Sequence, residues 1–124
     1  MKQQIATPLA PGAIGPYSQG IGAGQFLFAS GQLPIDHNTG AMPETAAEQA
    51  RQSLQNLQAI IEEGGSTMAG VVKTTIFLKD IGDFASVNEV YATFFPAPYP
   101  ARSCFAVADL PKGAKVEIEA IAVI

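Results

Sequence analysis

The chain has 124 residues, of which 48% are hydrophobic and 15% charged, a composition typical of one globular domain rather than of a disordered chain. Seven Lys and Arg against 11 Asp and Glu give a net charge of −4, and because no basic cluster occurs, we expect no nucleic-acid partner. The single cysteine excludes an internal disulfide, and no apolar run approaches the roughly 20 residues that cross a membrane. The first residues lack the apolar stretch of a secretory signal. We therefore expect one cytoplasmic domain over residues 1–124.

The N-terminal third of the chain predicts loops and one strand. Its first 24 residues are rich in glycine and proline and indicate loops with irregular strand. The segment 25–33 starts with a nearly apolar run and predicts a strand, whereas the segment 34–43 predicts a turn-rich loop.

The clearest predicted element is a helix from Thr45 to Glu63. Thr45 and Glu48 have the spacing of a capping box, and apolar residues recur at alternating spacings of three and four along one stripe. Gly64 and Gly65 are expected to end the helix, because glycine takes the left-handed terminal conformation without steric cost.

The second half of the chain predicts three strands and a second helix. These elements are a β-branched strand at 69–79, a helix at 83–95 capped by Asp83, and two closing strands at 102–110 and 115–124. Because a short turn, Pro111-Lys112-Gly113, joins the closing strands, we expect them to pair as a hairpin.

This order of elements predicts an α+β fold, with one mixed sheet covered on one face by two helices. The other face of the sheet would still carry Val, Ile, Phe and Ala side chains. The chain has no third helix to cover that face, so a second copy of the chain is the simplest cover.

The chain offers no residue set for a metal centre or a phosphate-binding loop. His37 and Cys104 are the only residues of their types and cannot form a zinc site. A Ser-His-Asp or Cys-His arrangement is also poorly supported, because His37 lies in a polar turn. No P-loop occurs, and we expect neither a metal nor a cofactor.

Arg102 opens a strand made mostly of apolar residues, where a guanidinium requires a planar anionic partner. One interpretation pairs it with Glu117 or Glu119 on the neighbouring hairpin strand. The other leaves it free to bind a substrate carboxylate through two parallel hydrogen bonds. Cys104 is expected on the same side as Arg102, where a lone strand cysteine is typically a small buried apolar residue.

The remaining polar candidates lie on other elements. Glu117 and Glu119 alternate with apolar residues, so both carboxylates share one face, which is either solvated or places a carboxylate where it can orient a water molecule. Tyr17 lies in a loop and could be a plain surface aromatic residue. Ser30-Gly31 could form a strand bulge, and Asn88 lies within a helix, where a side-chain partner is expected.

Several motifs follow one another in the order found in a known protein family. They are Ala13–Gly20, Ala29–Pro34, Val72–Phe77, Val87–Tyr91, Pro100–Cys104, and Leu110–Gly113 with Val116–Glu119. Through these motifs the chain resembles the reactive intermediate deaminase (Rid, YjgF) family over essentially its whole length. The resemblance is closest to the RidA subgroup, which keeps a substrate-binding arginine.

The resemblance implies a chorismate-mutase-like fold, in which three copies close a central barrel and sites lie in the clefts between neighbouring chains. It also implies hydrolysis of 2-aminoacrylate and 2-aminocrotonate, as their imine tautomers, to 2-keto acids and ammonia. The partners would therefore be a small 2-imino or 2-keto acid and two further copies of the chain. The reaction of this family needs no cofactor or metal.

The resemblance also implies roles for individual residues. Arg102 would bind the substrate carboxylate, assisted by the backbone at Cys104, and Glu117 would hold and orient the attacking water. Four more residues would line the cleft from the same or a neighbouring chain: Tyr17, Ser30, Gly31 and Asn88.

Two departures from the family pattern bear on substrate range. The proline-rich loop before Pro100 is shorter than in some relatives, and Phe105-Ala106 and Asp109 replace the Val-Glu and Arg common there. Two other functions compete with the deaminase. A non-catalytic module that binds keto acids or regulates a partner would use the same cleft residues, whereas the acidic charge balance weighs against a ribonuclease or translation inhibitor.

Overall fold

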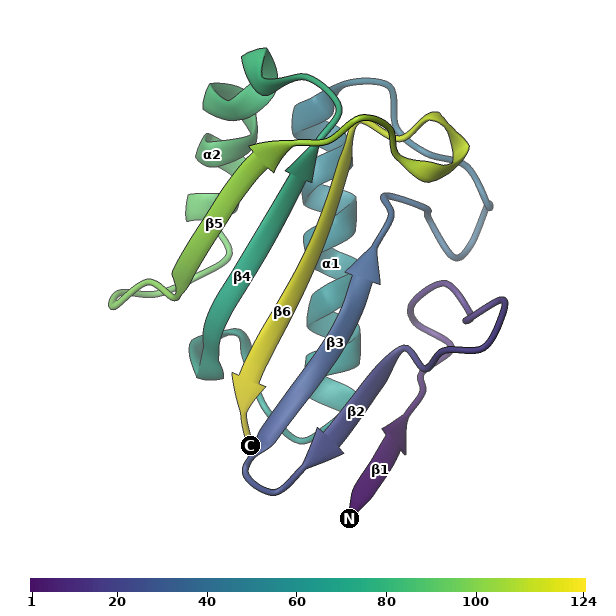
Figure 1. The fold of residues 1–124 in the computed structure, drawn as a ribbon, viewed down its shortest axis with the longest axis vertical. Helices are drawn as coiled ribbons and strands as arrows, with labels where there is room; N and C mark the ends of the chain where they lie inside the picture. Colours follow the sequence, from purple (N-terminus) through teal and green to yellow (C-terminus); the bar gives the residue numbers. More distant parts are fainter.

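A six-stranded sheet and two helices make up the computed structural model, which describes residues 1–124. The strands are β1 (Lys2–Ile5), β2 (Gly20–Ala23), β3 (Phe26–Gln32), β4 (Val71–Leu78), β5 (Ala101–Ala106) and β6 (Val116–Val123). The helices are α1 (Ala46–Glu63) and α2 (Phe84–Ala92). Both helices lie against the same face of the sheet (Figure 1), which confirms the predicted α+β fold. No helix is both long and apolar enough to span a membrane.

The strands run in the order β1-β2-β3-β6-β4-β5, and only the β4–β5 pair is parallel. The predicted closing hairpin is therefore wrong, because β4 lies between β5 and β6 and pairs with both. Residues 107–115 instead pass around the end of β4, where Val107 N donates to Leu78 O and Lys79 N donates to Lys115 O. The short turn at 111–113 belongs to this crossing, and α2 provides the connection that a parallel β4–β5 pair requires.

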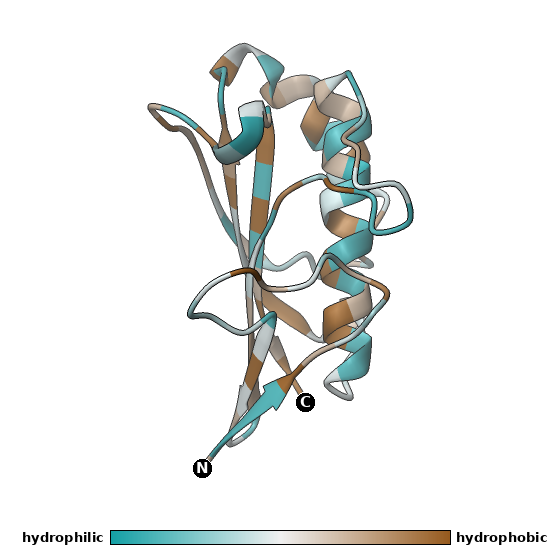
Figure 2. Cartoon of the chain, turned by 90° about the vertical axis from the view of Figure 1, so that its right-hand side faces the viewer, coloured by the Kyte–Doolittle hydropathy of each residue, from teal (hydrophilic) through white to brown (hydrophobic).

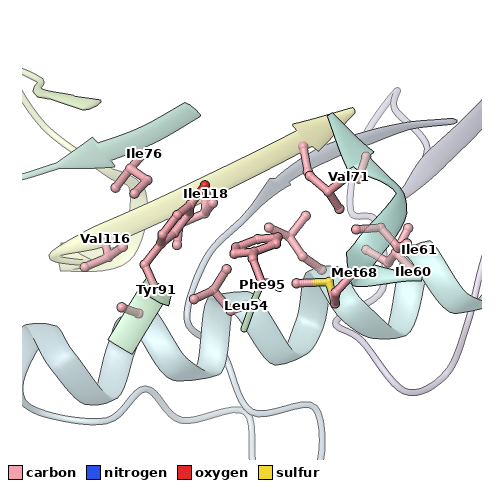
Figure 3. Close-up of a cluster of buried hydrophobic side chains, with 14 of the residues drawn as sticks. Leu54, Ile60, Ile61, Met68, Val71, Ile76, Tyr91, Phe95, Val116 and Ile118 are labelled. Atoms are coloured by element: carbon pink, nitrogen blue, oxygen red, sulfur yellow. The ribbon is translucent and has the colours of Figure 1, made fainter. Parts of the chain in front are cut away.

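The predicted boundaries of α1 are confirmed. Thr45 Oγ1 accepts a hydrogen bond from Glu48 N at 3.1 Å, and the Thr45 hydroxyl donates to Glu48 Oε1 at 2.8 Å. Gly65 has the left-handed φ of +91° just beyond the helix. The apolar stripe of α1 packs against the sheet, and Leu57 on this stripe is fully buried. Leu54, Ile60 and Ile61 are also fully buried there (Figure 3).

The second helix is shorter than predicted and lacks the predicted cap. It begins at Phe84 and ends at Ala92, and Asp83 makes no side-chain capping bond. Asp80 takes the capping role one turn earlier, where its Oδ1 accepts from Gly82 N at 2.8 Å. A 3₁₀ turn at residues 81–83 therefore precedes α2, and the aspartate that starts this turn is the capping residue.

The sheet face away from the helices is uncovered (Figure 2). Phe26 and Phe28 of β3 remain 45% and 44% exposed, and their partners on β6 are Val123 and Ile121. Phe105 of β5 is 46% exposed on the same face, beside Phe77. Large aromatic side chains are normally covered, so this face has the properties of a surface that another chain covers.

Asn56 of α1 fixes the loop that follows β3. Its side chain is 1% exposed, and its Nδ2 donates to Leu33 O at 3.1 Å and to Ile35 O at 3.0 Å. Its Oδ1 accepts from Gln52 Nε2 at 2.9 Å. A buried asparagine with all these bonds made is stable in the core only because the loop supplies the acceptors.

We expect Asn56→Leu to lower the free energy of unfolding by about 2 kcal/mol, because two partly buried carbonyl groups lose their donor. Urea unfolding followed by circular dichroism measures this change. Gln55→Leu, at the exposed neighbouring position, is the matched control and is expected to change the midpoint little. Equal midpoints for both variants would show that Asn56 does not hold the loop.

Candidate active site

Arg102 lies at the start of β5 with its guanidinium over two aromatic rings of α2. Its Cζ is 4.9 Å from the centre of the Tyr91 ring and 5.4 Å from that of Phe84. Its Nη1 donates a 2.6 Å hydrogen bond to Asn88 Oδ1. Phe84, Asn88 and Tyr91 share one helix face because they are spaced by four and three residues. This face of α2 therefore orients the guanidinium.

No carboxylate neutralises Arg102. The only salt bridge of the chain joins Lys79 to Asp109 at 3.5 Å, so of the two interpretations of Arg102, the ion pair with Glu117 or Glu119 is excluded. The reason is the position of β4 between β5 and β6. Since the guanidinium has five N–H donors, most of them remain available to an external anion.

Arg102 borders an open pocket of about 480 Å³. The other lining residues come from α2 and from the loop before β5, namely Asn88, Tyr91, Ala92, Tyr99 and Pro100. The structure therefore brings together two of the predicted site residues, Arg102 and Asn88. Sequence reasoning named Tyr91 as the end of a family motif and missed its contact with the guanidinium.

Tyr91 is a fixed platform rather than an ionisable group. Its hydroxyl shares a 2.7 Å hydrogen bond with Thr74 Oγ1, and its ring is buried against that of Phe95. Burial raises the pKa of the Tyr91 hydroxyl, although the Thr74 bond and the Arg102 charge oppose the shift. The phenol therefore stays neutral, and its ring face can stabilise the guanidinium.

Cys104 is partly buried and packs against the hydrophobic core. Burial raises the pKa of its thiol, and the nearby charge of Arg102 opposes this shift only in part. The thiol is therefore protonated at neutral pH and a poor nucleophile. This supports the interpretation of Cys104 as a small apolar residue.

Glu117 lines a second pocket, of about 580 Å³. Tyr17, Gly31 and Lys112 border the same pocket. Its charged lining residues are Glu117 and Lys112 alone, and the rest of the wall comes from apolar, amide and backbone groups of the loops. The structure therefore brings together Tyr17, Gly31 and Glu117 of the predicted site.

The bulge predicted at Ser30-Gly31 is present, because Ala29 pairs with Ala120 and Gln32 with Ile118, leaving the two residues between them unpaired. A Cβ at Gly31 would collide with the Glu117 carboxylate. Glycine at this bulge is thus what admits the carboxylate to the pocket.

Ser30 and Gln19 hold the loop that carries Tyr17. The Ser30 hydroxyl donates to Ser18 O at 2.6 Å, and Ser30 N donates to Gln19 O at 2.9 Å. The buried Gln19 side chain accepts from Thr7 N at 2.7 Å and donates to Thr7 O, Ala10 O and Pro11 O. Sequence reasoning missed Gln19, although it follows Tyr17 in the motif Gly15–Gly20.

Burial raises the pKa of the Glu117 carboxyl, and the negative charge of Glu119 raises it further. The two side chains share the uncovered face, as predicted, because both alternate with buried residues of β6. A carboxylate of raised pKa is a stronger base than an exposed glutamate and is suited to hold and deprotonate a water molecule.

The two pockets share no lining residue, and their charged side chains Arg102 and Glu117 point to opposite faces of the sheet. Arg102 pairs with Thr74, whose buried side chain faces the helices, whereas Glu117 pairs with Phe77 on the uncovered face. Paired residues on adjacent strands point to the same side of a sheet. A single chain therefore presents the cation and the carboxylate in different directions.

The chain is thus an α+β protein with an unneutralised guanidinium at one pocket and a half-buried carboxylate at another. A family model described as endoribonuclease L-PSP matches residues 7–124. The chain belongs to this family, also known as Rid or YjgF, which confirms the resemblance.

Curated relatives and solved structures agree with this assignment. The chain is 57% identical to RutC family protein y4sK of Sinorhizobium fredii, over 98% of this chain and 97% of the relative. It is 54% identical to the 2-iminobutanoate/2-iminopropanoate deaminase of Salmonella typhimurium, over 99% of this chain and 98% of the relative. The crystal structure of Escherichia coli TdcF with bound serine superposes with a TM-score of 0.95, at 49% identity and 98% coverage of both chains.

The raised pKa of Glu117 predicts how this residue affects stability. A folded-state pKa above the ordinary value of 4.5 means that the folded chain is favoured by protonation and loses stability as pH rises through that window. We expect Glu117→Gln to be as stable as the wild type near pH 4 and equally or more stable at pH 7.

Urea midpoints at several pH values measure this difference. Glu89→Gln, at an exposed position on α2, is the control and is expected to show no such trend. A Glu117→Gln protein that is markedly less stable than the wild type at pH 7 would contradict the argument.

Proposed function

We propose that the chain is a deaminase that hydrolyses 2-iminopropanoate and 2-iminobutanoate to the 2-keto acid and ammonia. Relatives of 53–54% identity, over 99% of this chain, carry this activity as their name. The observation that carries the proposal is the Arg102 guanidinium, which has no internal carboxylate partner and borders an open pocket. Such a group fits a small ligand with one carboxylate.

In the proposed mechanism, Arg102 binds the substrate carboxylate and Glu117 accepts a hydrogen bond from a water molecule. The water oxygen forms a bond to C2 of the imine, and a water proton passes through Glu117 to the nitrogen. The hydroxyl proton of the resulting carbinolamine then passes to the nitrogen, and ammonia leaves as the C2–N bond breaks and the C2–O double bond forms. Because an imine carbon is already electrophilic, most of the acceleration comes from holding the water and the substrate together.

The proposed site is formed by two chains. The pocket of Arg102 and Asn88 on one chain would face the pocket of Tyr17, Gly31 and Glu117 on its neighbour. Ser30 supports this second wall through the loop, and the backbone at Cys104 assists Arg102. Three chains would form the ring, with the uncovered sheet faces lining a central barrel. The exposed aromatic residues of that face support this arrangement.

The proposal also includes a cytoplasmic location and a reaction that needs no metal or cofactor. The chain has no group of three or more His, Cys, Asp or Glu residues that could hold a metal ion. The substrate itself supplies the electrophilic carbon that a metal would otherwise activate.

A ligand-binding role without turnover is the second candidate. It is favoured by one observation, the crystal structure of TdcF with bound serine, because serine has a carboxylate but no imine. A protein of this kind would bind 2-keto acids and leave the rate of imine hydrolysis unchanged.

We expect the wild type to accelerate keto-acid release when a serine or threonine dehydratase generates the imine in the same solution. Arg102→Ala is expected to lower kcat/KM about 10- to 100-fold, because a charge-assisted pair of hydrogen bonds is lost. Arg102→Lys keeps the charge but not the planar pair of donors, so its kcat/KM is expected to lie between those of the wild type and Arg102→Ala. Stopped-flow detection of the keto acid measures these rates.

Arg51→Ala, on the exposed side of α1, is the control and is expected to retain the wild-type rate. If the wild type gives no acceleration over buffer, the deaminase proposal fails. If it then still binds 2-oxobutanoate in an Arg102-dependent manner, the binding role takes its place.

Two impaired variants are expected to complement each other if the site lies between chains. Arg102→Ala and Glu117→Gln are unfolded together at equal concentration and refolded, so that chains mix at random. In a closed ring, about one quarter of the interfaces then combine an intact Arg102 with an intact Glu117, and about one quarter of the wild-type activity should return. Each variant refolded alone is the control. A verified mixture that is no more active than the separately refolded variants would show that one chain supplies both residues.

A further inference from the structure

Lys112 is the only residue other than glycine that has a positive φ in this chain. Its backbone angles are φ 59° and ψ 21°, in the left-handed region, and Gly113 follows with φ 71°. A side chain with a Cβ is disfavoured in this region, where glycine is the ordinary residue. The position therefore carries a lysine against the preference of its backbone.

The Lys112 side chain makes no interaction within the chain that would account for it. Lys79 forms the only salt bridge, and Lys115 donates to Glu44 O, whereas the Lys112 ammonium has neither kind of partner. Lys112 is exposed and does not contribute to the core. A stabilising role in the folded chain is thus not supported.

Lys112 borders the pocket that contains Glu117, and it is the only cation there. A substrate with a carboxylate must enter this pocket against the charge of Glu117, which lies beside Glu119, in a chain of net charge −4. Like charges in a partly buried cleft repel more strongly than in free solution. A cation at the mouth of the pocket offsets this repulsion.

We propose that Lys112 is a specificity-determining residue, which draws carboxylate-bearing ligands into the Glu117 pocket and favours them over neutral analogues. Its position, rather than a fixed salt bridge, provides the effect, because a flexible ammonium at a pocket mouth raises the local concentration of anions. This inference rests on the proposed function, since it assumes that the pocket receives a small carboxylic acid.

Binding and kinetics of two variants test the proposal. Lys112→Gln removes the charge. Lys112→Gly removes the charge and also the steric cost of the left-handed backbone conformation. We expect both to raise KM about threefold at low salt with kcat unchanged, a size typical of one surface charge. Because salt screens exposed charges, the difference should shrink as ionic strength rises toward about 1 M. The melting temperature of Lys112→Gly should be equal to or higher than that of the wild type.

The affinities for 2-oxobutanoate and for its neutral amide give a second readout that needs no turnover. We expect both variants to weaken binding of the acid and to leave binding of the amide unchanged. Arg51→Gln on the exposed side of α1 removes one positive charge away from both pockets and controls for net charge.

The outcomes separate this proposal from the proposed function. A wild type that binds 2-oxobutanoate without deaminating imines overturns the deaminase, whereas the Lys112 effect is still decided by the acid-to-amide ratio. An unchanged ratio in Lys112→Gln, a KM shift that persists in high salt, or an equal shift in Arg51→Gln overturns the role of Lys112. A wild type that binds neither 2-oxobutanoate nor its amide also overturns the role of Lys112.

Discussion

The position of β4 in the sheet controls the chemistry of this protein. It separates β5 from β6, so the guanidinium of Arg102 cannot reach the carboxylates of Glu117 and Glu119. An internal ion pair would satisfy both charges and leave nothing for a ligand. The parallel β4–β5 pair prevents this, while α2, which connects the two strands, supplies Asn88 and the aromatic rings beneath the arginine. One feature of topology thus keeps the cation available and orients it.

Arg102 and Glu117 lie in different local environments, and each environment sets the properties of its charged group. Arg102 is exposed and oriented by contacts that do not neutralise it, because aromatic faces and an amide oxygen attract a cation without a full negative charge. Glu117 is half-buried beside Glu119, which raises its pKa and makes it a better base. If the groups shared a pocket in one chain, the arginine would lower that pKa again. Within one chain the two groups point in different directions, so Arg102 does not lower the pKa of Glu117.

Local sequence patterns predicted both helices, most of the strands and the bulge, but they did not predict which strands pair. The capping box of α1, the bulge at Ser30-Gly31 and the shared face of Glu117 and Glu119 depend on neighbours in sequence, and all three are present. The predicted hairpin of the closing strands was wrong, because the residue pattern of a strand does not say which strand it pairs with. The parallel pair of β4 and β5 depends instead on the packing of α2, which connects them. Gln19 was missed for a related reason, since its side chain bonds to Thr7–Pro11, far back along the chain.

The two departures from the family pattern lie at different distances from the pockets. Asp109 forms an exposed salt bridge with Lys79 and lines neither pocket. A hydrogen bond from the Leu110 backbone and the charge of Lys79 lower the pKa of the Asp109 carboxyl. Phe105 packs edge-to-face on Phe77 over the uncovered sheet face. These changes therefore alter the surface of the chain and its uncovered sheet face rather than the walls of the two pockets. The loop before β5 is different, because Tyr99 borders the Arg102 pocket directly. An aromatic ring at that wall limits the room beside Arg102, so among these departures the loop is the one that alters the shape of the pocket.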